Sequence, residues 1–382
     1  MNSAIVGLQW GDEGKGKVVQ KFSRSHEWVV RFSGGPNAGH TVYHNGKKVI
    51  HHLVPTGTDK NKLFIGRGTL VNFDILNNEV AELSEIYHDV KERLFISEWC
   101  RVITPVERWQ DAEIEKLKGA KSVGTTRMGI GPAISNDANR VALHVFDLFD
   151  EKVLKEKAKL LKKFCGYQKD FEDDLLKAFD KVRERVKDPQ INGDILFEGT
   201  QGIMLDPMYG TYPYVTSTPT IPSYLSYGSG IKTEYEVFGV FKAYVTRVGA
   251  GPFPTELNDE VGDAIRKNGG EFGSTTGRPR RCGWIDLPQL KYAIDLSKTD
   301  HLVMTKADVL NGFDKIGVCV GYDRPFCAYD LEGVKTEIEY IKGWKSLESS
   351  EFGDFVSLIE KYTGKRVDYI SFGPSEEEIK IR

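Results

Sequence analysis

The segment Gly11-Asp12-Glu13-Gly14-Lys15-Gly16-Lys17-Val18 lies near the N-terminus and decides how the rest of the chain is interpreted. Its glycines and lysines fit the pattern G-x-x-x-x-G-K, a phosphate-binding loop whose backbone N–H groups hold nucleotide phosphates. The pattern normally ends in a serine or threonine that binds Mg²⁺, but this chain has Val18. An acidic side chain beside phosphates costs electrostatic energy unless it binds a metal ion or takes a proton. We therefore expect Asp12 to take part in chemistry at a nucleotide site.

The residues around this segment predict the strand, turn and helix that a phosphate-binding loop needs. Residues 4–8 are an apolar run that ends just before the loop, and Val18, Val19 and Phe22 recur at helical spacing after it. A second apolar run, residues 28–32, also ends in glycines. We predict further buried strands at residues 62–65, 194–197, 237–245 and 301–304.

Strands that alternate with helices along a chain favour an α/β fold with a largely parallel sheet. Residues 151–187 are charged and carry one apolar stripe at a spacing of three or four residues, which predicts helices packed on the core. The chain has no internal repeat and no obvious linker. We predict that residues 1–382 form a single domain, with residues 151–187 as a helical insertion.

Composition excludes several classes of protein. The 382 residues carry a net charge of −3, so no overall basic field recruits nucleic acid. No window approaches the ~18 consecutive apolar residues of a membrane-spanning helix, and the N-terminus lacks a signal-peptide pattern. The five cysteines form no C-x-x-C pair, which is typical of reduced thiols in a cytosol. We expect a cytoplasmic protein that binds neither nucleic acid nor membranes.

A second glycine turn, Ser33-Gly34-Gly35-Pro36-Asn37-Ala38-Gly39-His40-Thr41, follows the predicted strand at residues 28–32. We expect it to open at the same edge of the sheet as the first loop. An imidazole near phosphates can donate a proton or stabilise the charge that develops during phosphoryl transfer. A lone histidine is more often structural, but beside a phosphate loop we favour a catalytic role for His40.

The segment Thr305-Lys306-Ala307-Asp308 directly follows the apolar run at residues 301–304. A carboxylate at a strand end can accept hydrogen bonds from the N1–H and 2-amino groups of guanine, a donor pair that adenine lacks. The aliphatic stem of Lys306 can pack on the base. The motif is short, but together with the phosphate loop it predicts that Asp308 selects GTP.

The segment Phe272-Gly273-Ser274-Thr275-Thr276-Gly277-Arg278-Pro279-Arg280-Arg281 places three arginines in four positions on a small polar loop. Such a loop suits a carboxylate or a phosphate. A solvated basic turn or an RNA-binding patch are the alternatives, but no interleaved aromatic residues support RNA. Three weaker segments also suit nucleotide contacts: Gly124-Thr125-Thr126, Glu198-Gly199-Thr200-Gln201-Gly202 and Tyr212-Pro213-Tyr214-Val215-Thr216.

Together these segments resemble the adenylosuccinate synthetase family, in the family's order, from Trp10 to Pro374. The strings that carry the resemblance are QWGDEGKGK, GGPNAGHT, GTTRMGIGPA, FEGTQG, GTYPYVTS, RVGAGPFPTEL, EFGSTTGRPRRCGW, TKADVL and SFGP. The resemblance implies a phosphate-loop-like GTP-binding ligase fold. It also implies a reaction that joins L-aspartate to a 6-oxopurine nucleotide, normally IMP, with GTP and Mg²⁺.

In that reaction the resemblance gives Asp12 two roles, as the base that removes the purine N1 proton and as a ligand of Mg²⁺. His40 assists transfer of the γ-phosphoryl group to O6, and the amine of aspartate then displaces this phosphate at C6. The resemblance implies that the carbonyl of Gly39 is the second protein ligand of Mg²⁺, beside Asp12. Splitting the reaction in this way replaces a poor oxide leaving group by a good one.

The resemblance also distributes the remaining residues among three binding regions. Those for GTP are Gly11, Glu13, Gly14, Lys15, Gly16, Lys17, Gly39, His40, Thr41, Arg280, Lys306, Ala307, Asp308, Ser371, Phe372 and Gly373. Those for the acceptor nucleotide are Asp12, Lys15, Asn37, Ala38, Thr126, Arg140, Gln201, Thr216 and Arg278. Those for aspartate are Ser274, Thr275, Thr276, Gly277, Arg278 and Arg280. Arg140 matches an arginine that a second subunit lends, which implies a homodimer.

Three segments depart from the family's usual pattern: Arg127-Met128, residues 134–139 and residues 218–222. All three are expected near the acceptor nucleotide, so dGMP, as in phage-encoded relatives, is an alternative acceptor to IMP. Those relatives commonly lose the loop carboxylate, and the presence of Asp12 favours IMP. A GTP-binding switch protein is a more distant alternative, which Val18, Asp12 and the three arginines oppose.

Overall fold

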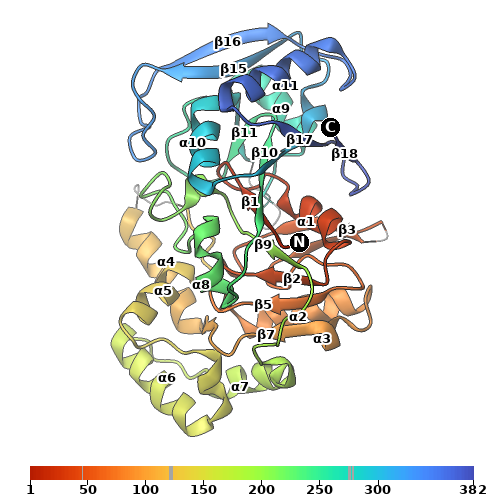
Figure 1. Cartoon of the computed structure of the whole chain (residues 1–382). Coiled ribbons are helices and arrows are strands. Elements are labelled where there is room, and N and C mark those ends of the chain that lie inside the picture. The colour runs from red at the N-terminus through yellow and green to blue at the C-terminus, as the bar shows by residue number, and fades with distance from the viewer. Residues whose placement is uncertain (45, 120–123, 274–276, 278) are drawn as a thin grey trace.

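The computed structural model describes residues 1–44, 46–119, 124–273, 277 and 279–382. Within them, nine strands form one central sheet (Figure 1). In spatial order these are β18 (Ile379–Ile381), β17 (Val367–Ser371), β14 (His301–Thr305), β10 (Glu236–Lys242), β1 (Ser3–Gly7), β9 (Ile195–Glu198), β2 (Trp28–Arg31), β5 (Lys62–Ile65) and β7 (Leu94–Ile96). All neighbouring pairs are parallel except β17 with β18. The predicted mostly parallel sheet is confirmed, and so are five of the six predicted strands. The sixth, predicted at residues 237–245, is divided, because the chain bends at residues 243–244 between β10 and β11 (Val245–Arg247), which belongs to a separate sheet.

Helices and short strands surround this sheet. The helices are α1 (Lys15–Ser23), α2 (Phe73–Ser84), α3 (Val90–Arg93), α4 (Pro105–Lys118), α5 (Ile130–Ala138), α6 (Glu151–Cys165), α7 (Glu172–Asp180), α8 (Leu225–Ser229), α9 (Glu260–Gly269), α10 (Leu287–Ser297) and α11 (Ser350–Thr363). The short sheets pair β3 (His40–His44) with β4 (Lys47–His51), β6 (Leu70–Val71) with β8 (Arg101–Val102), β11 (Val245–Arg247) with β12 (Arg281–Gly283), and β15 (Lys315–Tyr322) with both β13 (Ile285–Asp286) and β16 (Thr336–Lys342). Local chemistry sets many helix starts, as where Thr104 and Glu107 form a capping box at α4.

The hydrophobic core lies on both faces of the sheet. In β14, Val303 belongs to the cluster on one face, and its neighbours Leu302 and Met304 belong to the cluster on the other. Alternation of this kind is what a strand buried on both faces requires, and it explains the nearly unbroken apolar runs in the sequence. The predicted helical stripe of residues 151–187 is also core-facing, since Leu175 and Phe179 of α7 are buried.

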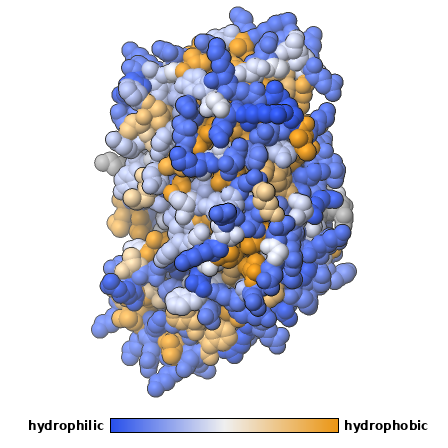
Figure 2. Space-filling view, viewed as in Figure 1, coloured by the Kyte–Doolittle hydropathy of each residue, from blue (hydrophilic) through white to orange (hydrophobic). Residues whose placement is uncertain are grey.

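The described part of the chain has an elongated shape in Figure 1, with β15, β16 and α11 at one end and α6 and α7 at the other. The face shown in Figure 2 is hydrophilic over most of its area, with hydrophobic residues in separate groups. Among the described residues, no helix is both long and apolar enough to span a membrane. The five cysteines, all in the described part, are unpaired, as predicted.

The sheet brings the predicted motifs to one edge. β1 lies between β9 and β10, and β9 also pairs in parallel with β2, so the segments that follow β1, β2 and β9 leave the sheet in the same direction. β14 pairs in parallel with β10, which adds the Lys306 segment to this edge. The carboxyl ends of parallel strands are where open α/β folds bind their ligands. The prediction that the two glycine turns open at one edge is confirmed.

Candidate active site

The phosphate loop is held in shape by one of its own acids. The buried carboxylate of Glu13 accepts hydrogen bonds from the N–H groups of Gln9 and Gly11 at 3.1 and 2.9 Å, and it pairs with the amine of Lys15 at 2.6 Å. Helix α1 begins directly after Gly14, which adopts a left-handed conformation with φ of 84°. The sequence led us to expect both acids beside the phosphates, but the side chain of Glu13 points into the loop.

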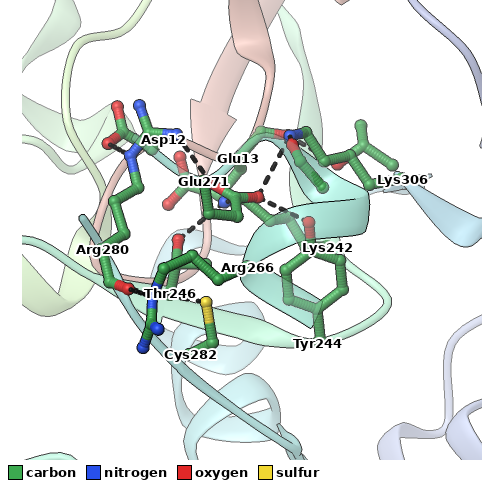
Figure 3. A network of polar contacts seen from close by, with 12 residues as sticks. Asp12, Glu13, Lys242, Tyr244, Thr246, Arg266, Glu271, Arg280, Cys282 and Lys306 are labelled. Carbon is green, nitrogen blue, oxygen red and sulfur yellow. Dashed lines mark hydrogen bonds and ion pairs between the residues drawn. The ribbon is translucent and has the colours of Figure 1, made fainter. Parts of the chain in front are cut away.

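Asp12 is the acid that the loop exposes. Its side chain keeps 33% of its surface accessible, and its backbone φ of +59° is unusual for a residue other than glycine. Its Oδ2 atom lies 2.7 Å from Nε of Arg280, across the loop (Figure 3). A strained backbone that presents a carboxylate toward solvent is a feature that clusters at functional sites.

His40 lies beside the phosphate loop and is oriented by a buried carboxylate. Its Nδ1 hydrogen-bonds to Oε1 of Glu198, at the end of β9, and the same carboxylate accepts from the N–H and hydroxyl of Thr56, both at 2.8 Å. Burial lowers the pKa of His40, and Glu198 offsets this only in part. Burial raises the pKa of Glu198, but the neighbouring His40 and Arg31 outweigh it and keep this carboxylate ionised. The arrangement leaves Nε2 of His40 as the ring nitrogen available to a substrate.

Gly16 is the point at which the phosphate loop and His40 meet. A Cβ atom on Gly16 would lie 2.9 Å from Cβ of His40, closer than side-chain carbons normally approach. The absence of a side chain at Gly16 therefore lets α1 start directly against the histidine.

We predict that Gly16→Ala lowers kcat by about 10- to 100-fold, because displacement of His40 or the loop by about 1 Å is enough for such a loss. Helix propensity alone would favour alanine by about 1 kcal/mol. Gly353→Ala is the matched control, since a methyl group on that glycine of α11 would have no neighbour within 4 Å among the described residues. Steady-state kinetics and thermal melting should show a higher Tm and unchanged kcat for Gly353→Ala. Equal kcat in both variants would contradict the prediction.

Residues 305–308, which the sequence predicts to bind guanine and which we call the guanine-side loop, are joined directly to the phosphate loop. The hydroxyl of Thr305 donates to the carbonyl of Glu13 at 2.6 Å. Lys306 follows in a left-handed conformation, with φ of 54°, and Asp308 accepts a 3.2 Å hydrogen bond from the N–H of Gly373. The predicted pocket residues of both segments, including Ala307, Ser371 and Phe372, therefore lie around one turn.

Lys17 contacts this turn. Its amine donates to the carbonyls of Phe372, Gly373 and Glu378 at 2.7, 3.0 and 3.3 Å. Burial lowers its pKa to about 8, although Glu378 and Asp308 raise it in part. The structure thus places the Lys17 amine as a link between α1 and the guanine-side turn, whereas the sequence suggested a phosphate contact.

The predicted acceptor-nucleotide residues converge from four segments. Among the described residues, the buried amide oxygens of Asn37 and Gln201 are without a hydrogen-bond partner, as expected for groups that a ligand satisfies. Gln201 also has a positive φ of 52°. The second glycine turn packs against the start of α5, since a methyl group on Gly35 would lie 2.8 Å from Ile130. The start of α5 also lies close to the segment that contains Thr216, since a methyl group on Gly131 would lie 3.2 Å from Ser217.

Thr126 is exposed on the segment before α5, and Thr216 lies next to Ser217. Arg140, by contrast, is exposed beyond the far end of α5, about 13 Å of helix away from Ile130 at 1.5 Å per residue. Arg140 therefore lies at the opposite end of α5 from Ile130, which contacts Gly35 of the second glycine turn. Ala38, Gly39 and Thr41 flank His40 in the second glycine turn and the start of β3.

Four predicted residues of the arginine loop lie outside the described residues: Ser274, Thr275, Thr276 and Arg278. Gly277 is described, exposed and left-handed, with φ of 64°. Arg280 is described too, and its pairing with Asp12 joins the arginine loop to the phosphate loop.

Sequence reasoning missed the roles of two buried carboxylates. Glu198 stands out in the sequence only as part of a glycine-rich string, and Glu271, one residue before the arginine loop, has no local pattern around it. A possible signal for Glu271 was Lys242, a lone charge within the apolar run of residues 237–245 that needs a buried counterion.

A parallel α/β sheet whose edge carries a phosphate-binding loop, the carboxylate of Asp308 and a basic loop is typical of a nucleotide-dependent enzyme of the phosphate-loop type. The family model for adenylosuccinate synthetase matches residues 4–380. Adenylosuccinate synthetases of Thermotoga maritima and Pseudothermotoga lettingae are 49% and 43% identical, each over 99% of both chains. The fully ligated adenylosuccinate synthetase of Plasmodium falciparum superposes with a TM-score of 0.92 at 32% identity, covering 100% of this chain and 99% of that one. The chain belongs to the adenylosuccinate synthetase family.

The chain is accordingly a ligase of purine biosynthesis that forms a C–N bond, joining L-aspartate to IMP at the expense of GTP. A more distant structure, cyanophage S-2L succinoaminodeoxyadenylate synthetase bound to dGMP and dATP, superposes with a TM-score of 0.67 at 20% identity. That similarity extends to the fold alone. Membership of the adenylosuccinate synthetase family supports the predicted reaction with IMP and excludes the switch protein.

Proposed function

We propose that Asp12 and His40 carry the two chemical roles of this synthetase. Asp12 removes the N1 proton of IMP, which makes O6 a nucleophile toward the γ-phosphorus of GTP. His40 stabilises the charge of the transferring phosphoryl group through Nε2–H. The amine of aspartate then attacks C6, the C6–O6 bond breaks, and phosphate leaves.

One observation carries this assignment more than any other. Asp12 and His40 follow different strands, β1 and β2, yet the fold brings both to the phosphate loop, with Gly16 against the histidine. Asp12 is partly exposed and thus accessible to a substrate, whereas His40 is fixed from behind by Glu198. A base and a charge-stabilising group at one phosphate-binding loop are what a phosphoryl transfer to O6 requires.

We further propose that Mg²⁺ binds at Asp12 and the carbonyl of Gly39. Within the described residues no group of three or more His, Cys, Asp or Glu side chains could form a metal site by itself. The observation that supports Mg²⁺ is the partly exposed carboxylate of Asp12, since this ion in nucleotide enzymes is held by one or two carboxylates together with substrate phosphates and waters. The bound ion would neutralise charge on the phosphates.

For the base of GTP, we propose Asp308 as the acceptor of the guanine N1–H and 2-amino groups, with Lys306 packed on the ring. The carboxylate of Asp308 accepts a hydrogen bond from the N–H of Gly373. Lys17 links the turn at Gly373 to α1. Lys17 of α1 thus connects the proposed base subsite with the proposed phosphate subsite through hydrogen bonds. The remaining proposals are that aspartate binds at the arginine loop and that the enzyme works in the cytoplasm, which the unpaired cysteines favour.

We propose that the working unit is a homodimer in which Arg140 of one subunit reaches the acceptor nucleotide of the other. The support is its exposed position beyond the C-terminal end of α5, opposite to the end at which Ile130 contacts the second glycine turn. Arginine is suited to this role because it binds phosphate in a bidentate manner.

Mixed dimers test this arrangement. Asp12→Asn and Arg140→Ala homodimers should both be nearly inactive. Co-expression of the two with different tags should restore one intact site per heterodimer, or about a quarter of wild-type activity in a random mixture. Activity that stays at the level of the parent homodimers would show that Arg140 does not act across an interface.

A further inference from the structure

The strongest unassigned feature of the molecule is a buried carboxylate that holds three cations. Oε1 of Glu271 lies 2.9 Å from the amine of Lys242 and 3.0 Å from that of Lys306, and Oε2 lies 2.6 Å from Nη1 of Arg280 (Figure 3). The hydroxyl of Tyr244 donates to Oε1 at 2.5 Å. Glu271 itself has no exposed surface.

These cations are of two kinds. Lys242 is fully buried and also donates to the hydroxyl of Thr246 at 2.6 Å, so it anchors Glu271 from the protein interior. Lys306 and Arg280 keep 32% and 11% of their side-chain surface accessible and can therefore meet ligands. Lys306 belongs to the guanine-side loop, and Arg280 pairs with Asp12. One carboxylate thus joins the two subsites.

We propose that Glu271 is a positioning residue of the synthetase reaction, which couples recognition of the guanine base at Lys306 to the placement of Arg280 beside Asp12. The inference rests on the reaction assigned to the chain, and it does not require Asp12 to be the base. Its physical basis is rigidity, because a buried carboxylate that satisfies three cations fixes the position of each. A shift of Lys306 when the base binds is then passed to Arg280 through a single group.

The cluster's charge also fits this role. Lys242, Lys306 and Arg280 carry three positive charges, and Glu271 and Asp12 carry two negative ones, so the cluster retains one positive charge. Burial raises the pKa of Glu271, but the cations outweigh this and keep the carboxylate ionised. The remaining positive charge favours anionic phosphates.

The test is Glu271→Gln, which keeps the size and an acceptor oxygen but removes the charge. We expect kcat to fall about 10- to 100-fold and KM for GTP to rise, with KM for IMP changed less than twofold. Lys306→Ala should lower kcat/KM for GTP about tenfold in the parent but less than threefold in the Glu271→Gln background. Additive effects of the two substitutions would overturn the coupling.

Two further variants separate coupling from folding. Glu271→Gln leaves a buried cation, so Glu271→Gln with Lys242→Met removes the buried pair together, a change that folded proteins often tolerate. A folded double variant that kept the parent's kcat and KM, and in which Lys306→Ala lowered kcat/KM for GTP as much as in the parent, would show that Glu271 has a structural role only. Glu172→Gln is the control, since Glu172 pairs with Lys162 between α7 and α6, at the end of the molecule away from the site, and should change kcat less than twofold. Asp308→Asn serves as a comparison for base recognition alone. We expect it to lower the preference for GTP over ATP, measured as kcat/KM, without a comparable loss of kcat.

Discussion

Asp12→Asn is expected to lower ligation by at least about 1,000-fold while GTP still binds. Proton abstraction by a positioned carboxylate contributes about 10²–10⁴-fold to a rate, and the amide can neither accept the N1 proton nor bind Mg²⁺ strongly. Asparagine has the same shape and tolerates the left-handed backbone at this position, where φ is +59°. The loop should therefore keep its fold.

Steady-state kinetics with IMP and aspartate would give the loss in kcat, and calorimetric titration with GTP would report binding separately. The matched control is Asp188→Asn, which breaks a 2.6 Å ion pair with Arg67 away from the site and should leave kcat within twofold. Retained ligation by Asp12→Asn would remove Asp12 as the base. If Asp12→Asn lost GTP binding to the same extent as ligation, Asp12 would serve in GTP binding alone.

The outcome also bears on Arg280. In the structure, the Asp12 carboxylate is 2.7 Å from this guanidinium, which Glu271 holds from the other side. Asp12→Asn removes one of the two carboxylates that pair with Arg280 and leaves the other, Glu271. A larger loss for Asp12→Asn than for Glu271→Gln would therefore separate chemistry at the carboxylate from positioning of the arginine.

The sequence predicted the parts of this site that are local in the chain. Asp12 and His40 stand in glycine-rich turns whose spacing and flanking strands are recognisable, and Asp308 stands directly after a buried strand. The parallel sheet then brings them to one edge, as a consequence of strand direction alone. The direction of each side chain within a turn was not predictable, and Glu13 and Lys17 show this, since tertiary contacts from residues 372–378 and from the loop itself decide where they point.

The residues that sequence reasoning missed act over long distances in the chain. Glu198 and His40 are 158 residues apart, and no local pattern indicates that the two meet. Glu271 gathers cations from three separate segments, and nothing in the sequence indicates that Lys242, Arg280 and Lys306 share one acid. Buried acids of this kind become visible only when the fold places the cations around them.

Glu198→Gln is expected to change the pH dependence of ligation as well as its rate. The carboxylate of Glu198 is held ionised and faces Nδ1 of His40, so it favours the charged form of the imidazole. Burial already lowers the pKa of His40. Removal of the negative charge lowers that pKa further, which means that the protonated histidine is lost at a lower pH than in the parent.

If protonated His40 stabilises the transferring phosphoryl group, the loss in kcat must grow as the pH rises. Because the pKa of His40 already lies below its ordinary value of 6.5, we expect this loss to grow up to about pH 7 and to stay constant above it, at about 10- to 100-fold, measured as kcat at saturating substrates from pH 5 to 9. Glu107→Gln is the control, because that buried carboxylate belongs to the capping box of α4 and its loss should lower Tm without moving the pH profile. A loss in Glu198→Gln that is the same at every pH would mean that Glu198 only packs His40 in place. In that case the neutral imidazole, as a hydrogen-bond donor through Nε2, would have to supply the stabilisation.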